Sequence, residues 1–476
     1  MTKLEDPPFS DYGRASLTPS PVRRMMAQFA SDFRDGVDVN LGVGYVNENT
    51  IPRHLIVEAV RAVLEGPKRY DKPLNYGASK GYKALLEAIR RYIVSGPGAE
   101  LGRAGAGLGG AGARLSGTSG SGADGGITEE ALAGREIVIG VSGATSLLEA
   151  MACVLRRGIV VTADPMYYIY CNFLERLGWE ILPVPEDGDG MRMDLLQEKL
   201  AALGPRVADV RFFYAVTVNN PTGTIMSSQR RIELRRIAED LSRRLGRKVP
   251  VVFDKAYEEL IHDPSAGAPR SAIIGDEMGL VYEISTVSKI LAPGLRIGYM
   301  VGPDGPLLRV IVQRVSDIGF SAPPINQVIA AYMLDHHIAG QVQAVNAGYR
   351  RKALAVRGWL ERDLGPRIEH MTGGQAGFYY YITLRDVETC EGSAMLRFLS
   401  RATGEPAIDG PAGALKPRVI YIPGQYCVHP RGDLVAVGRR QMRLSYGFEE
   451  LPNIERAIGL IREAAEYAEG TPTSRP

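Results

Sequence analysis

Short apolar runs alternate with helix-like segments along the middle of this chain. The runs are rich in valine, isoleucine and aromatic residues, and they predict strands at 136–141, 158–162, 179–184, 210–218, 249–253, 281–285 and 296–301. Around them, apolar residues recur three or four positions apart, which predicts helices at 82–93, 147–155, 169–177, 193–203 and 228–245. This alternation predicts an α/β fold, with a mostly parallel sheet covered by helices on both faces.

The pattern changes after residue 323. Helix dominates up to residue 364, and strand-like runs at 378–382, 419–422 and 442–446 then mix with helices. A chain of 476 residues is long enough for two to three domains. We therefore predict a large domain at 51–330 and a smaller α/β domain at 331–476, to which the N-terminal segment 1–50 also belongs.

Glycine, alanine and serine dominate residues 96–126. Leucines at 101, 108 and 115 are almost the whole apolar content of this segment. So little apolar surface cannot offset the entropy lost on ordering the chain. Because regular patterns resume on both sides, we predict a flexible surface insertion inside the large domain.

Charge and cysteine content narrow the class of protein. The chain has 56 Lys and Arg against 54 Asp and Glu, so its balance does not indicate a nucleic-acid or membrane-surface partner. Residues 1–11 are polar, and we expect no secretory signal there. The four cysteines, Cys153, Cys171, Cys390 and Cys427, form no C-x-x-C pair, which favours reduced thiols in a cytoplasmic protein.

Polar groups follow four of the predicted strands. They are the small residues after 136–141, Asn220 after 210–218, Asp254 and Tyr257 after 249–253, and Lys289 after 281–285. Taken singly, each has a structural explanation as a helix cap, a tight turn, a helix-start carboxylate or a solvated lysine. Ligands of open α/β sheets bind at the carboxyl ends of the strands, so these groups are expected to meet in one site.

Together these groups match the needs of pyridoxal phosphate. Its aldehyde requires a lysine amine, and its pyridine nitrogen requires a carboxylate. Its phosphate requires hydroxyls, the backbone N–H groups of a helix N-terminus and an arginine such as Arg296. The sequence therefore predicts this cofactor.

The order of the motifs resembles the fold-type I, class I/II aminotransferase family. The motifs are Gly-Ala-Thr at 143–145, Asn-Asn-Pro-Thr-Gly at 219–223, Asp-x-Ala-Tyr at 254–257, Ser-Lys with Pro-Gly-Leu-Arg-Ile-Gly-Tyr at 288–299, and Arg-Leu-Ser at 443–445. The likeness runs from Pro19 to the final helix, apart from the glycine-rich insertion. It implies a pyridoxal-phosphate aminotransferase that moves an amino group from an L-amino acid to a 2-oxo acid by a ping-pong mechanism.

The resemblance also implies roles for single residues. Lys289 holds the cofactor and moves the proton, Asp254 pairs with the pyridinium, and Tyr257 with Asn220 bonds the phenolic oxygen. The other cofactor-binding residues are Gly143, Ala144, Thr145, Thr286, Ser288 and Arg296 around the phosphate and Tyr167 on the ring.

Substrate and subunit contacts are implied in the same way. Arg443 holds the substrate α-carboxylate in a bidentate fork, Gly44 lines the pocket, and Asn220 and Arg23 also face the substrate. Tyr76 resembles the tyrosine that reaches the phosphate of the partner subunit, which implies a homodimer with shared active sites.

At a finer level, the sequence resembles two different branches of this family. Residues 19–25 and the Pro-Gly-Leu-Arg spacing are similar to the kynurenine/2-aminoadipate branch, in which the N-terminal segment folds over the active site. Residues 44–48 lack the Gly-Gly-x-Pro of that branch, and 254–257 is closer to the aspartate-aminotransferase pattern. The amino donor and the acceptor therefore remain open.

Two other kinds of function compete with this hypothesis. A lyase, decarboxylase or oxidase would use the same residues, because the cofactor alone does not fix which Cα bond breaks. A transcription regulator needs a DNA-binding module before the domain, and we expect none because the resemblance begins near Pro19.

Three further features are predicted to have structural roles. The six histidines show no metal-ligand spacing, so we expect no metal, and His336 with His337 reads as a helix end. Glycines at 373–377 are interpreted as a turn before a strand. Four arginines, Arg230, Arg231, Arg235 and Arg236, are predicted to form a solvated helix face.

Overall fold

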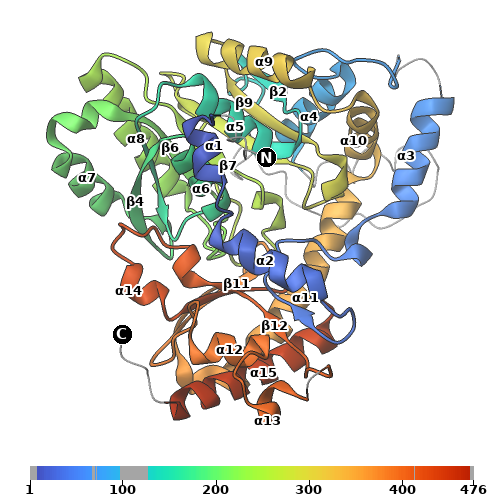
Figure 1. Ribbon diagram of the computed structural model, residues 1–476. Helices are drawn as coiled ribbons and strands as arrows, with labels where there is room; N and C mark the ends of the chain where they lie inside the picture. The colour runs from blue at the N-terminus through green and yellow to red at the C-terminus, as the bar shows by residue number, and fades with distance from the viewer. Residues whose placement is uncertain (1–7, 67–69, 71, 97–126, 412, 472–476) are drawn as a thin grey trace, which may run out of the picture.

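A computed structural model of the protein describes residues 8–66, 70, 72–96, 127–411 and 413–471. The larger part of it surrounds one extended sheet, and a smaller layer lies below it in the view of Figure 1. The glycine-rich segment predicted as an insertion at 96–126 lies outside the described residues except for Gly96, which follows the last turn of a helix.

The large sheet has the strand order β2-β9-β8-β7-β6-β3-β4-β5. Its strands are β2 (Arg135–Ile139), β3 (Ile159–Asp164), β4 (Glu180–Asp187), β5 (Gly190–Met191), β6 (Val210–Val216), β7 (Val251–Asp254), β8 (Val281–Thr286) and β9 (Gly298–Pro303). Only β9 and β5 run antiparallel to their neighbours. The predicted mostly parallel sheet is confirmed, and the strand bounds differ from the prediction by a few residues.

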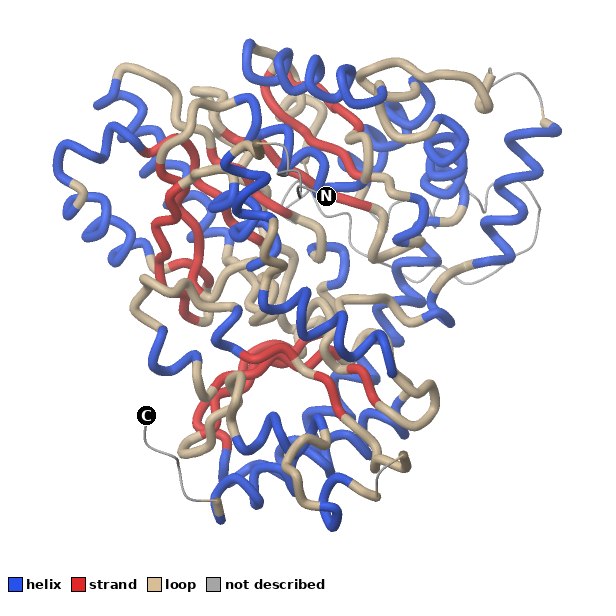
Figure 2. The backbone as a smooth tube through the Cα atoms, viewed as in Figure 1, coloured by secondary structure: helices blue, strands red, loops and turns tan. Residues whose placement is uncertain are grey.

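Helices cover both faces of this sheet because its strands are apolar on both sides (Figure 2). Along β7, Val252 packs with α5, α6 and α9, while Val251 and Phe253 face the core that contains α3, α4, α7, α8 and α10. The helices are α3 (Arg53–Glu65), α4 (Lys83–Ser95), α5 (Gly143–Val154), α6 (Tyr168–Arg176), α7 (Met193–Ala202), α8 (Ser228–Leu245), α9 (Pro306–Gly319) and α10 (Pro324–His336). The end of α10 at His336 confirms the predicted helix end.

The smaller layer has an antiparallel sheet of order β10-β11-β14-β13. Its strands are β10 (Ile368–Gly373), β11 (Tyr379–Leu384), β13 (Ile422–Pro423) and β14 (Gln441–Ser445). Its helices are α11 (Ile338–Leu364), α12 (Ala394–Ser400), α13 (Pro406–Asp409), α14 (Val435–Gly438) and α15 (Leu451–Gly470). The predicted turn at 373–377 joins β10 to β11.

The N-terminal segment lies along this smaller layer. Helix α2 (Pro21–Asp32) packs its Val22 and Met25 with Tyr381 and Ile422, and β1 (Val39–Asn40) pairs in parallel with β12 (Val419–Ile420). A short helix, α1 (Asp11–Ser16), precedes α2 and contacts α6 (Figure 1). The described residues also form short 3₁₀ helices: η1 (Glu48–Thr50), η3 (Gly204–Asp209), η4 (Glu258–Leu260), η5 (Pro293–Leu295), η6 (Gly365–Arg367) and η7 (Gly424–Tyr426).

The strand predicted at 419–422 is wrong as a single element. Residues 419 and 420 pair with β1, whereas residues 422 and 423 pair with β14 in the four-stranded sheet. Between them, the hydroxyl of the buried Tyr421 donates to the carbonyl of Thr389 at 2.6 Å. The chain passes from one sheet to another within four residues, and an apolar run does not reveal such a change of partner.

The solvated arginine face predicted on α8 is also wrong in part. Arg231 and Arg235 are buried, because they share a helix face with Leu234 and Ala238, which pack in the core. Arg231 pairs with Glu258 at 2.9 Å, which compensates its buried charge. Arg236 is exposed, as predicted, whereas Arg230 is only partly exposed and pairs with Asp187 at 2.8 Å.

Two searches of the described residues bear on function. None of the helices in that part of the chain has the length and apolar character to cross a bilayer. The same residues contain no group of three or more His, Cys, Asp or Glu placed to hold a metal ion. All four cysteines are free thiols, and Cys153 is the exposed one.

Candidate active site

A cavity of about 130 Å³ lies at the carboxyl ends of β6, β7 and β8. The start of α5 and the turn after β8 close its sides. Its lining residues are Ala144, Thr145, Leu148, Tyr167, Val216, Asn220, Asp254, Ala256, Tyr257, Thr286, Ser288, Lys289, Pro293 and Arg296. Residues predicted from four separate motifs therefore meet in one place.

Lys289 lies in the turn that follows β8. Its Nζ donates a hydrogen bond to the carbonyl of Gly44 at 3.1 Å. Burial, together with the positive charges of Arg296 and Arg443, lowers the pKa of Lys289 to about 8. An amine with this pKa is partly neutral near physiological pH, as a nucleophile or general base requires.

Asp254 is the last residue of β7 and is buried in the cavity wall. Its two carboxyl oxygens accept from the Tyr214 hydroxyl at 2.9 Å and from the Ala256 N–H at 3.1 Å. Burial raises the pKa of Asp254, while these hydrogen bonds and the charge of Lys289 oppose the rise. A cation bound beside this carboxylate would favour its ionised form further.

The opposite end of the cavity is suited to an anion. Helix α5 begins at Gly143, and no side chain caps its first turn. Gly143 has a φ of +66°, a left-handed conformation that favours glycine, and a Cβ there would lie 2.9 Å from Nη2 of Arg296. Nearby, the Thr286 and Ser288 hydroxyls lie 2.8 Å apart and add donors. Helix N–H groups, hydroxyls and a guanidinium are a typical phosphate site.

Arg443 lies on β14 and is buried beside the cavity. Its Nη1 donates to the Asn220 side-chain oxygen at 2.7 Å, and its Nη2 donates to the carbonyl of Gly42 at 2.5 Å. Its Nε is buried and has no partner among the described residues. A buried donor without an acceptor is costly, and a ligand carboxylate would supply one.

Sequence reasoning missed Tyr379 and Gly42. The Tyr379 hydroxyl lies 2.8 Å from the Tyr257 hydroxyl, and its ring lies 4.5 Å from the Arg443 guanidinium carbon. Tyr379 belongs to an apolar strand, so the pattern suggested only a core residue. The carbonyl of Gly42 accepts from Arg443, and backbone acceptors leave no residue-type signal.

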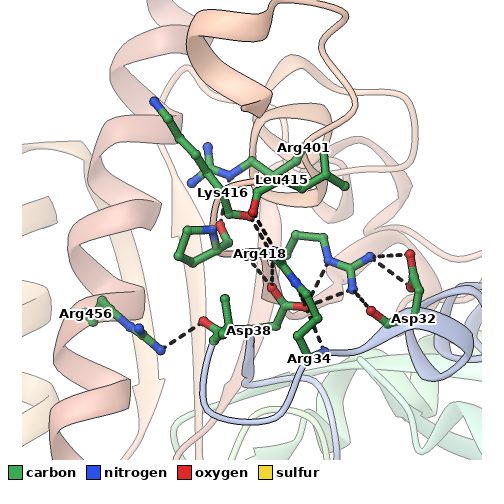
Figure 3. A network of polar contacts seen from close by, with 10 residues as sticks. Asp32, Arg34, Asp38, Arg401, Leu415, Lys416, Arg418 and Arg456 are labelled. Atoms are coloured by element: carbon green, nitrogen blue, oxygen red, sulfur yellow. Dashed lines mark hydrogen bonds and ion pairs between the residues drawn. The ribbon is translucent and has the colours of Figure 1, made fainter. Parts of the chain in front are cut away.

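An ionic network fixes the segment that carries Gly42 and Gly44 (Figure 3). Asp38 accepts from Arg418 at 2.8 Å and from Arg34 at 2.7 Å. Burial alone would raise the pKa of Asp38, but the two arginine hydrogen bonds outweigh burial and hold the pKa well below its usual range. The N-terminal segment is thereby tied to the smaller layer next to the site.

Two predicted site residues lie elsewhere in this chain. Tyr76 is 88% exposed and contacts the ring of Phe320, with 5.9 Å between ring centroids. Arg23 lies on α2 with an exposed side chain, and its backbone N–H donates to the Ser20 hydroxyl at 3.3 Å. Neither residue lines the cavity.

The described residues fit pyridoxal phosphate in chemistry and in order. The cavity has a buried amine with a lowered pKa, a carboxylate on the sheet and an uncapped helix N-terminus with Arg296. The unpartnered Nε of Arg443 adds a place for a substrate carboxylate.

The comparisons with known proteins place the chain in a family. The family model described as aminotransferase class I and II matches residues 129–401. The uncharacterized HTH-type transcriptional regulator YisV of Bacillus subtilis is 25% identical over 345 residues, which cover 68% of this chain and 60% of that protein. Aromatic-amino-acid aminotransferase 1 of Thermococcus litoralis is 26% identical over 350 residues, 73% of each chain. The chain thus spans less than two thirds of the length of YisV.

The fold is similar to that of solved aminotransferases. The structure of Pyrococcus horikoshii kynurenine aminotransferase, in complex with PMP, superposes with a TM-score of 0.75 at 23% identity and covers 96% of each chain. The architecture is therefore that of a fold-type I transferase. Because the family model spans more than half of the sequence, the chain belongs to the class I and II aminotransferase family.

Proposed function

We propose that this protein is a pyridoxal-phosphate aminotransferase that moves an amino group from an L-amino acid to a 2-oxo acid by a ping-pong mechanism. One observation carries the proposal: the Lys289 amine, the Asp254 carboxylate and an anion-binding helix start surround a single cavity. The family of the chain and its 26% identity to the Thermococcus litoralis aminotransferase support it.

The cofactor's groups divide among the residues of the cavity. Asp254 would bind the ring nitrogen and keep it protonated, while Arg296, Thr286, Ser288, Thr145 and the N–H groups of Gly143 and Ala144 would hold the phosphate. Tyr167 would pack on the ring, and Asn220 and Tyr257 would donate to the ring oxygen. When bound, pyridoxal phosphate supplies an electron sink for the negative charge that develops at the substrate Cα.

Lys289 first holds the cofactor and then moves the proton. Its Nζ would accept the proton from the substrate Cα and deliver it again on the cofactor side. Its pKa of about 8 suits both directions of this transfer near neutral pH. General-base transfer of this kind contributes on the order of 10²–10⁴ in rate.

Arg443 orients the substrate. Its guanidinium is held by Asn220 and Gly42, so it presents a fixed fork to the α-carboxylate. The ion pair stabilises the carboxylate and would be lost if the group left as neutral carbon dioxide, which opposes decarboxylation. Proton loss from Cα is therefore favoured over decarboxylation, as an aminotransferase requires.

Assembly and location are part of the proposal. Tyr76, Leu74 and Phe320 are exposed, and a second subunit that receives Tyr76 at its phosphate site would cover them. We assign a homodimer with shared active sites, a large domain at 51–330 and a small domain formed by 1–50 and 331–476. Four free thiols are consistent with a cytoplasmic protein.

A half-reaction tests the proposal. One equivalent of the correct amino acid, without acceptor or oxygen, is expected to convert the yellow cofactor into its amine form, and a 2-oxo acid is expected to restore the yellow colour. A screen of amino donors by cofactor absorbance identifies the substrate. If ammonia, carbon dioxide or peroxide accumulates while the cofactor stays yellow, the chain is a lyase, a decarboxylase or an oxidase.

Two variants assign the roles within this reaction. Lys289→Ala is expected to stay folded but to lose the yellow colour, and borohydride is expected to fix the cofactor of the wild-type protein on Lys289. Fixation on Lys255 would overturn the assignment.

Arg443→Lys is expected to keep the colour and to lose at least ~2 kcal/mol of transition-state binding, because a point charge replaces a fork.

A further inference from the structure

A second, larger cavity lies at the opposite edge of the eight-stranded sheet. Its volume is about 590 Å³, which is ample for a small organic molecule. Arg211 and Tyr282 line it near the starts of β6 and β8, and Pro303 lines it at the end of β9. At their other ends, β6 and β8 carry Val216 and Thr286 of the candidate active site, so the two cavities are separated by the length of the strands.

The walls of this cavity are largely apolar. Tyr282 is buried on its strand and lines the cavity. The remaining apolar lining residues are Leu155, Pro250, Pro303, Pro306 and Leu307. An apolar chamber with a polar group inside it is typical of a site for a ligand with an aromatic or aliphatic body.

Positive charge gathers around these walls. The lining includes Arg156, Arg211, Arg247 and Lys248, whereas Asp304 is the one acidic side chain among the described residues that line the cavity. Asp304 already lies 3.6 Å from Arg309, outside the lining. The cavity therefore carries an excess of positive charge at neutral pH.

Little in the described part of the chain neutralises that charge. Arg156 is exposed and makes no hydrogen bond or ion pair there, and Lys248 reaches only the carbonyl of Gly279, at 3.4 Å. Arg247 donates to the carbonyls of Ala208 and Val210, at 2.8 Å each, and has no carboxylate partner.

Arg211 increases the positive field at Arg247. Burial and then the charge of Arg211 lower the pKa of Arg247, while Asp209, which lies 3.6 Å from Arg211, offsets part of this effect. An anion that entered the cavity would relieve this repulsion.

We propose that this cavity binds a small organic anion, a molecule with an apolar aromatic or aliphatic body and one carboxylate or phosphate group. The apolar body would lie against Tyr282, Leu155 and Leu307, with its anionic group toward Arg156, Arg247 and Lys248. Guanidinium groups bind both carboxylate and phosphate by paired hydrogen bonds, so the two anions share one chemistry. The site is separate from the proposed transamination and does not depend on it.

Calorimetric titration of the cofactor-loaded protein tests this site. Indole-3-acetate serves as the carboxylate probe and adenosine monophosphate as the phosphate probe. At least one of the two probes is expected to bind with one equivalent per chain. The probe with the higher affinity shows whether the cavity prefers a carboxylate or a phosphate. Absence of heat with both probes at millimolar concentration would overturn the proposal.

Charge-reversal variants locate the binding. The double variant Arg156→Glu with Lys248→Glu is expected to weaken binding at least tenfold, and both side chains are exposed, so the fold should tolerate the change. Arg157→Glu is the matched control, because Arg157 is exposed next to Arg156 but does not line the cavity. Equal affinity in the double variant and the control would place the probe elsewhere and refute the site.

A third variant tests the apolar part. Leu307→Trp fills the cavity without a change of charge and is expected to weaken binding at least tenfold while amino-donor turnover stays unchanged. If Leu307→Trp binds the probe as the wild type does, the cavity is not the binding site. Thermal melts of each variant show that the fold persists.

Discussion

Two lysines near the cavity have opposite electrostatic surroundings. Burial and the charges of Arg296 and Arg443 lower the pKa of Lys289 to about 8. Burial would also lower the pKa of Lys255, but the carboxylates of Glu258 and Glu283, at 3.1 and 2.9 Å, raise it well above its usual value. Residue type alone does not distinguish these two amines, and their neighbours do.

The difference predicts selective labelling in the cofactor-free protein. Only a neutral amine attacks trinitrobenzenesulfonate, so labelling of Lys289 is expected to rise with pH and to reach half of its maximum rate near pH 8. Lys255 is expected to remain unlabelled over the same range, because its amine keeps its proton. Peptide mass spectrometry follows both residues. A midpoint near pH 10 for Lys289 would contradict the lowered pKa.

Tyr379 is predicted to act through Tyr257. Tyr379→Phe removes the hydroxyl that lies 2.8 Å from the Tyr257 hydroxyl but keeps the ring beside Arg443. A hydrogen bond of about 0.5–1.5 kcal/mol corresponds to a two- to tenfold fall in kcat, with KM little changed because Arg443 remains.

Tyr381→Phe is the matched control for Tyr379. Its hydroxyl bonds Gln441 at 3.0 Å and does not contact Tyr257. A purely structural role for Tyr379 would lower stability and leave the pH dependence of cofactor absorbance unchanged. A shift of that pH dependence in Tyr379→Phe, and not in the control, identifies a positioning residue.

At the scale of the elements, a buried ionic network around Asp38 holds the N-terminal segment in place. Asp38→Asn removes the carboxylate that Arg418 and Arg34 share, and it is expected to lower the free energy of unfolding by about 3–5 kcal/mol because a buried charge loses its partner. Urea denaturation measures the loss. Asp32→Asn is the control: its side chain is 60% exposed, so the change should cost about 1 kcal/mol or less.

The same carboxylate predicts the direction of the acid response. The pKa of Asp38 in the folded protein lies below the unfolded value of about 3.9, so the folded state binds fewer protons. Its stabilising contribution is complete above about pH 5 and is lost as the pH falls toward the folded-state pKa. Asp38→Asn should therefore lose less stability than the wild type between pH 5 and pH 3.

Elements with a strong period were predictable from the sequence, and those without one were not. Strands such as β6 and β8 are long apolar runs, and α8 (Ser228–Leu245) was predicted with the same bounds. Strands of two residues, such as β1 and β12, are too short to show alternation, and only their pairing defines them. The same holds for the site. Asp254 and Lys289 lie at the ends of strands that the sequence pattern predicted, whereas the position of Tyr379 depends on how its strand pairs with its neighbours.

Burial of charge was the least predictable property. Helical spacing placed Arg231 on a face of α8, but the choice between solvent and core depended on Glu258, a residue from another segment. Helix amphipathicity describes one element, whereas an ion pair between elements depends on tertiary structure. The same reason hid the role of Asp38.

At the scale of the whole molecule, the exposed Tyr76 predicts shared sites in a dimer. Tyr76→Ala is expected to weaken cofactor binding, and Lys289→Ala is expected to abolish turnover. A hybrid of the two variants contains one site with both residues intact, because the subunit with Lys289 receives Tyr76 from the subunit without it.

Mixing the two variants is therefore expected to restore turnover to a fraction of the wild-type value. Size-exclusion chromatography with light scattering checks that dimers form and exchange. Each variant mixed with itself is the control. Without recovery in the hybrid, Tyr76 would act within its own chain or not at all.

The backbone contacts of residues 41–44 have a consequence for the order of synthesis. The carbonyl of Leu41 accepts from the Ser445 N–H at 2.7 Å, and that of Gly42 accepts from Arg443, 401 positions later in the chain. The ribosome synthesises residues 41 and 42 long before it synthesises their partners, Arg443 and Ser445. A nascent chain therefore possesses all strands of the large sheet while Arg443, the proposed carboxylate-binding residue, is still untranslated. The proposed substrate pocket is completed only after both segments have been translated, so a chain that ends before Arg443 is expected to show no aminotransferase activity.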